Sequence, residues 1–170
     1  MSEQKAKNVM EQPHIDKVVL TVGGTGEDLE KGIKLLKVIA NRTPAEQITQ
    51  KRISALGVRP GLKVGGVVTV RQGKHELLQR LLEAVDKTLK AKQVSENSFS
   101  FGISEYIEIP GVEYQRDIGI RGLEVTVTFK KPGRRVKLKK PKKGKLPRKQ
   151  RVSKEEIIKF MEYNFDVNFK

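Results

Sequence analysis

The chain has no cysteine and no tryptophan, and only two histidines among its 170 residues. The absence of cysteine excludes a disulfide framework and thiolate chemistry, and it fits a reducing compartment. A zinc site needs about four nitrogen, sulfur or carboxylate ligands at workable spacing, and His14 and His75 do not supply them. Glu105, Glu108 and Glu113 are too scattered to nominate as an acid–base pair. We therefore expect no metal, no other cofactor and no enzyme activity.

Long apolar runs are also missing. No stretch approaches the roughly 18 apolar residues that a membrane-spanning helix requires. The N-terminal sequence MSEQKAKNVMEQPHI lacks the apolar region of a secretory signal. A chain of 170 residues can bury one core and does not by its length call for two domains. We expect a single intracellular domain over residues 1–170, with no membrane partner.

Acidic residues are absent from one long segment, KKPGRRVKLKKPKKGKLPRKQR (130–151), which we name the basic arm. It holds 13 Lys or Arg among 22 residues, whereas the other 148 residues have a net charge of only +2 out of the total of +15. Such a concentrated block attracts polyanions, and its glycines and prolines predict an extended, tethered segment. The cations nominated for binding are Arg134, Arg135, Lys137, Lys139, Lys140, Lys142, Lys143, Lys145, Arg148, Lys149 and Arg151.

Nucleic acid is the partner that this arm favours. A membrane surface would require an apolar anchoring face, and Val136, Leu138 and Leu146 supply little. Aromatic residues make up only 5% of the chain, which argues against stacking platforms for single strands and favours structured RNA or duplex backbone. A solvated charge run without any partner is the alternative.

The apolar periodicity predicts an α+β fold. Alternating residues indicate strands over 15–22, 64–71, 99–103 and 123–129, with a shorter strand over 46–50. Helical spacing predicts helices over 28–41 and 75–89, and Ser153 with Glu156 forms a capping box that begins a third helix. The glycine-rich turn GGTGED (23–28) lacks the spacing of a nucleotide-binding loop, so a tight strand-to-helix turn is favoured over a phosphate site.

Two predicted strands carry polar side chains on one face. Lys17 and Thr21 alternate with Val18, Leu20 and Val22, and Thr69 with Arg71 alternates with Val68 and Val70. Because side chains of a strand alternate between the two faces, one side of the sheet should be apolar. The other side should present hydroxyls and cations.

Three segments carry a resemblance to a known family. They are NVMEQPHIDKVVLTVGGTGE (8–27), GVRPGLKVGGVVTVR (57–71) and NSFSFGISEYIEIPGVEYQRDIGIRGLEVTVTFKKPGRRV (97–136). In order and spacing they resemble the universal large-subunit ribosomal proteins that bind 5S rRNA, in their archaeal form. The resemblance extends from about Asn8 to the C-terminus. It implies an antiparallel sheet with helices packed mainly on one face, and a place in the central protuberance of the large subunit.

The resemblance also implies partners and contact residues. The 5S rRNA contacts of the family fall on Thr21, Arg42 and Thr69, to which the face analysis adds Lys17 and Arg71. Thr69 matches the family, whereas Thr21 and Arg42 stand where the bacterial branch usually has asparagine and glutamine. The implied partners are 5S rRNA, large-subunit rRNA, P-site tRNA, other 5S-binding ribosomal proteins and a small-subunit protein across the subunit bridge.

The loop ALGVRPGLKVG (55–65) matches the tRNA-proximal loop of the family, with Arg59 and Lys63 as its cations; a plain connector is the alternative. The basic arm is longer than in bacterial relatives, and its expected partner is rRNA, tRNA or both. We therefore interpret the chain as a structural, RNA-binding protein of the cytoplasmic ribosome. An RNA-binding assembly or regulatory factor outside the ribosome is the second hypothesis.

Overall fold

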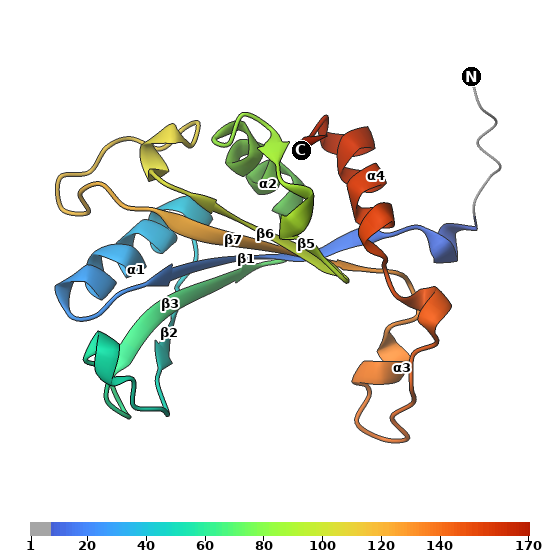
Figure 1. Cartoon of the computed structure of the whole chain (residues 1–170), viewed down its shortest axis with the longest axis horizontal. Coiled ribbons are helices and arrows are strands. Elements are labelled where there is room, and N and C mark those ends of the chain that lie inside the picture. Colours follow the sequence, from blue (N-terminus) through green and yellow to red (C-terminus); the bar gives the residue numbers. More distant parts are fainter. Residues whose placement is uncertain (1–7) are drawn as a thin grey trace.

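The computed structural model describes residues 8–170 and shows an α+β fold built on a six-stranded sheet (Figure 1). Residues 1–7 of the expected domain, and with them part of the N-terminal stretch inspected for a signal, lie outside the described residues. The strand order is β2-β3-β1-β7-β6-β5, and every neighbouring pair is antiparallel. The strands of this sheet are β1 (His14–Gly23), β2 (Ala45–Ile48), β3 (Lys63–Val70), β5 (Val94–Ser95), β6 (Ser98–Ile103) and β7 (Leu123–Lys130).

The remaining elements cover and connect this sheet. The helices are α1 (Glu27–Ala40), α2 (Lys74–Glu83), α3 (Arg135–Leu138) and α4 (Lys154–Phe165). Short 3-10 turns lie at Val9–Glu11, Ser54–Leu56, Ala91–Gln93, Tyr106–Glu108 and Arg148–Gln150. A separate parallel pair, β4 (Thr88–Leu89) with β8 (Asn168–Phe169), ties the last residues to the segment after α2.

Strand β1 occupies the centre of the sheet because its alternating side chains fit both neighbours. Val18 pairs in register with Val70 of β3 and with Val127 of β7, and Val18 and Val127 are fully buried. The register shifts between Ile15 and Lys17, which leaves Asp16 at a bulge opposite β7. Bulges re-aim the side chains beside them, and the carboxylate of Asp16 meets the ammonium group of Lys130 at the end of β7.

Helices α1, α2 and α4 all lie on one side of the sheet (Figure 1), so the predicted fold class is confirmed. Two glycines permit the closest approach. A Cβ on Gly32 of α1 would lie 2.5 Å from Cγ1 of Val22, and one on Gly66 of β3 would lie 3.3 Å from Cδ1 of Leu36. The valine and leucine side chains of the covered face therefore form one buried cluster with the apolar stripes of the helices.

The predicted helix over 75–89 is wrong in its second half. The helix ends at Glu83, and Asp86 and Lys87 adopt left-handed φ values of 50° and 52°. The amide of Lys87 then donates to the carbonyl of Leu82 at 3.0 Å, which closes the helix. Leu89 continues the apolar stripe because β4 packs on the same core that the helix faces.

The predicted start of α4 is confirmed. The hydroxyl of Ser153 accepts from the amide of Glu156 at 3.3 Å, and the Glu156 carboxylate accepts from the amide of Ser153 at 3.1 Å. Both bonds satisfy amides that would otherwise lack partners at a helix N-terminus. The GGTGED segment is a strand-to-helix turn as expected, with Gly26 at a φ of 59°. The carboxylate of Asp28 pairs with Arg121.

Candidate nucleic-acid interface

The side of the sheet opposite the helices is uncovered, and we call it the open face. Its side chains are half-buried, in contrast to the buried chains that alternate with them. Apart from Val19 and Val67, its positions in β1, β3, β6 and β7 are polar. They are Lys17, Thr21, Thr69, Ser98, Ser100, Glu124, Thr126 and Thr128.

Strand register arranges these polar groups in rows. Val19 pairs with Thr69 on one side and with Thr126 on the other, and Thr126 pairs with Ser100. The two hydroxyls of the last pair lie 3.0 Å apart. In the next row Lys17 pairs with Thr128. A strip of hydroxyls thus crosses four strands, and hydroxyls can donate to or accept from sugar and phosphate oxygens.

The structure brings three of the five residues predicted to contact 5S rRNA onto this face. Lys17, Thr21 and Thr69 lie there together, and Arg71 follows directly after Val70, the last residue of β3. Arg42 is separate. It is exposed and precedes β2, whose first residue pairs with Val67 at the edge of the sheet.

Sequence patterns did not nominate four hydroxyl residues of the open face. Ser98, Ser100, Thr126 and Thr128 lie on β6 and β7, across β1 from the nominated Thr69. Their alternation with apolar residues predicted strands and no contact role. The same period-two pattern could have nominated them, because a polar residue between two buried ones in a one-side-covered sheet must lie on the other face.

The connection between β2 and β3 (49–62), which we call the β2–β3 loop, projects beyond one end of the sheet (Figure 1). Its backbone is closed by hydrogen bonds. The amide of Thr49 donates to the carbonyl of Leu62 at 3.0 Å, and the amides of Ile53 and Val58 donate to each other's carbonyls at 2.9 and 3.1 Å. The loop is therefore a folded hairpin rather than an open connector.

The two nominated cations of this loop are in different environments. Arg59 is exposed. Lys63 is the first residue of β3, and its ammonium group lies 2.7 Å from the carboxylate of Glu46. The hydrogen bond and the charge of Glu46 raise the pKa of Lys63. The positive charge of Lys63 is thus partly compensated within the protein, which its position in the sequence did not indicate.

The basic arm leaves the opposite end of the sheet, on the same side as the β2–β3 loop (Figure 1). Ten of its eleven nominated cations are exposed, and Arg134 is half-buried. The expectation of an extended segment is wrong. The arm contains α3 and a turn, and the amide of Gly144 donates to the carbonyl of Val136 at 3.1 Å, so the segment folds back on itself.

The root of the arm belongs to the folded core. Lys130 is the last residue of β7, and Lys131 is only 6% exposed, with its ammonium group 2.7 Å from the carboxylate of Glu156. Asn97 joins the two limbs: its carbonyl accepts from the amide of Phe129 at 2.7 Å, and its side chain accepts from the amide of Val152 at 3.1 Å. The arm is therefore held at both ends.

Asp16, at the bulge in β1, is the second anchor of the root. Its carboxylate lies 2.7 Å from the Lys130 ammonium and 3.9 Å from the Arg134 guanidinium. Partial burial favours the protonated carboxyl, but the hydrogen bond and charge of Lys130, with the charges of Arg134 and Lys17, lower the pKa of Asp16. Burial and the charges of Lys130 and Lys74 lower the pKa of His14 beside it.

Within residues 8–170, no three His, Asp or Glu side chains gather in a group that could hold a metal ion. In the same range, no helix combines the length and apolar character needed to cross a membrane.

Comparison with known proteins agrees with these features. Residues 63–160 match the C-terminal region that defines the ribosomal L5 family. The chain is 40% identical to the large ribosomal subunit protein uL5 of Sulfolobus acidocaldarius, an alignment that covers 98% of this chain and 96% of the relative. It is 37% identical to uL5 of Methanobrevibacter smithii (95% and 98% covered) and 40% identical to uL5 of Nanoarchaeum equitans (93% and 96%). An α+β sheet with one open polar face and a basic arm is thus the form of a chain that belongs to the uL5 family of large ribosomal subunit proteins.

Proposed function

We propose that this protein is a structural constituent of the large ribosomal subunit that binds 5S rRNA through the open face of its sheet. The observation that carries the proposal is the shape in Figure 1: helices cover one side of the sheet, and two cation-bearing projections flank the other. RNA fits this arrangement because the hydroxyl strip can contact sugars and phosphates while the cations neutralise the backbone. The proposed contacts are Lys17, Thr21, Arg42, Thr69 and Arg71.

The two projections are proposed to meet different RNAs. The β2–β3 loop, with Arg59 and Lys63, would lie near P-site tRNA, as the family resemblance implies. The basic arm leaves the other end of the sheet, so we assign it to large-subunit rRNA. In this role the protein helps to attach 5S rRNA in the central protuberance, beside other 5S-binding proteins, and bridges to a small-subunit protein. No step of catalysis is involved.

The experiment compares two double variants with the same loss of charge. Lys17→Ala with Arg71→Ala removes two cations at the open face. Lys34→Ala with Lys37→Ala removes two exposed cations from α1, on the covered side. We expect the first pair to weaken 5S rRNA binding by at least about 10-fold, since each phosphate contact contributes a separate counterion-release term, and the second pair by less than about 3-fold.

Thr69→Ala, which changes no charge, should also weaken binding while the circular dichroism spectrum stays native. Equal losses for the two double variants would contradict the assignment of the open face. Absence of the wild-type protein from the large-subunit peak of a sucrose gradient would favour a factor outside the ribosome.

A further inference from the structure

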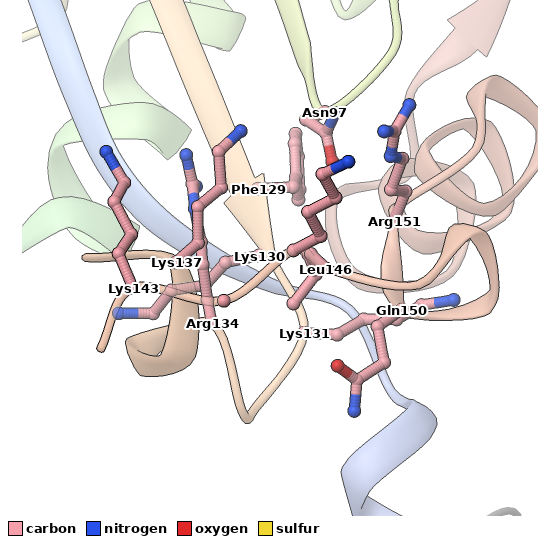
Figure 2. A pocket seen from close by; sticks show the side chains of 12 residues that line it. Asn97, Phe129, Lys130, Lys131, Arg134, Lys137, Lys143, Leu146, Gln150 and Arg151 are labelled. Atoms are coloured by element: carbon pink, nitrogen blue, oxygen red, sulfur yellow. The ribbon is translucent and has the colours of Figure 1, made fainter. Parts of the chain in front are cut away.

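The folded arm encloses a hollow of about 630 Å³ between its two limbs and the end of β7 (Figure 2). Seven lysine or arginine side chains line this hollow, and no acidic side chain does. A flexible lysine-rich segment would spread its charges apart, because like charges repel. Here the backbone instead holds them around one space.

Two glycines specify this backbone path. A Cβ on Gly144 would lie 2.8 Å from Cγ1 of Val136, so only glycine lets the two limbs meet at that point. Gly133 has a φ of 89°, a conformation that side-chain-bearing residues rarely adopt, and it lies against Gln150. The convergence of charge is therefore built into the sequence of the arm rather than being one conformation among many.

The cations of the hollow fall into two sets. Lys130, Lys131 and Arg134 at its base already pair with Asp16 or Glu156. Lys137, Lys143, Lys145 and Arg151 form no ion pair within the described part of the chain. Figure 2 shows the nitrogen ends of Lys137 and Lys143 pointing the same way.

We infer that the hollow is a multi-phosphate site that holds neighbouring phosphate groups of one RNA strand at a sharp turn of its backbone. Several converging ammonium and guanidinium groups match several phosphates close together, because each phosphate oxygen accepts charge-assisted hydrogen bonds. A straight duplex spreads its phosphates along a line and would engage only one limb of the arm. The inference deepens the rRNA contact proposed for the arm, and it rests on that proposed function for the identity of the strand.

The test uses the full-length protein, with inorganic tripolyphosphate as the probe for closely spaced phosphates. The hollow variant is K137Q/K143Q/K145Q. The matched control, K139Q/K140Q/K142Q, removes the same charge from lysines of the arm that do not line the hollow. By calorimetric titration at constant ionic strength, we expect the hollow variant to bind tripolyphosphate at least about 10-fold more weakly and the control to change less than about 3-fold.

A charge-neutral variant addresses the fold of the arm. Gly144→Ala forces the limbs apart without altering any cation, so it should also weaken tripolyphosphate binding, while the melting temperature and circular dichroism report on the domain. Equal weakening by the hollow and control variants would overturn the inference, because charge density alone would then explain binding. So would failure of the wild-type protein to bind tripolyphosphate.

The source of the phosphates is tested by competition. Saturating tripolyphosphate should weaken binding of large-subunit rRNA fragments by the wild-type protein and leave binding by the hollow variant unchanged. Full RNA affinity in the presence of the probe would overturn the assignment to RNA. Titration of 5S rRNA against the same proteins separates the two proposals, because the open face can fail that assay while the hollow still binds tripolyphosphate, and the reverse.

Discussion

The β2–β3 loop and the basic arm leave opposite ends of one sheet, and they keep their shapes by different means. The loop is closed by backbone hydrogen bonds within itself, and it exposes apolar side chains such as Leu56, which is 71% exposed. The arm is fastened at its root by Asp16, Glu156 and Asn97, and beyond the root it exposes cations. A self-supported loop can present shape, whereas an anchored charged arm presents electrostatic potential.

This difference predicts that salt affects the two projections unequally, and removal of the arm should produce the largest effect. Deleting residues 137–149 removes eight cations. Affinity for rRNA should fall by about 10²-fold or more near 0.1 M salt, and the slope of log K against log salt should become shallower by about 0.9 for each phosphate that the arm no longer neutralises. Filter binding across a salt series measures both quantities.

The deletion should leave the domain folded, because it spares Lys131 and Val152 at the root. We expect the melting temperature of the free protein to hold or rise as like-charge repulsion is relieved. The matched comparison is Arg59→Ala in the β2–β3 loop, which should lower the salt slope by no more than about one phosphate's share. An unfolded deletion variant would show that the arm is part of the core.

The second prediction concerns the root alone. Glu156→Ala leaves the buried Lys131 ammonium without its carboxylate and removes one bond of the α4 capping box. We expect a loss of about 2–3 kcal/mol in the free energy of unfolding, since breaking a buried pair costs more than an exposed one. Urea unfolding measures the loss. Glu155→Ala, one residue earlier and exposed, is the control and should stay within about 0.5 kcal/mol.

The smallest effect compares one ion pair from each end. Asp16→Asn removes the partner of Lys130 and Arg134 at the arm root, and Glu46→Gln removes the partner of Lys63 at the loop. The first should cost about 0.5–1 kcal/mol because the pair is partly buried. The second should leave the melting temperature unchanged, because both of its partners are exposed.

Asp16 also gives a pH dependence with a defined sign. Because its pKa is lowered in the folded protein, its stabilising contribution is complete above the unfolded-state pKa of about 3.9. That contribution is lost as the pH falls through the lower folded-state pKa. Asp16→Asn should therefore flatten the acid limb of the melting-temperature profile, and a profile identical to wild type would show that the root pair contributes nothing.

Sequence patterns predicted the strands and the start of each long helix, because burial on one face imposes its period on the residues. They failed where a tertiary partner decides the conformation. Leu89 continues a helical stripe, yet it lies in β4 because β8 pairs with it from the far end of the chain. The fold of the basic arm was missed for the same reason, since its root depends on Asp16 and Glu156, which are distant in sequence.

The candidate site followed a similar division. Lys17, Thr21 and Thr69 could be placed on one face from local alternation alone. The hydroxyls of β6 and β7 could not be joined to them without the strand order, because a period-two pattern gives the face of a strand but not its neighbour. The compensation of Lys63 by Glu46 depends on the pairing of β2 with β3, which is likewise a property of the assembled sheet.

The position of β1 has a consequence for how the protein folds. Its partner β7 lies more than 100 residues later in the chain, so Thr21 meets Glu124, and Lys17 meets Thr128, only after a long segment has closed. Pairing of such high sequence separation slows folding, because the entropy of loop closure is lost before the contacts form. On a chain emerging from N to C, β1 and β3 can pair first, but the hydroxyl strip stays incomplete until β7 arrives. The proposed RNA surface is therefore a late product of folding, and a partly folded chain would not yet offer it.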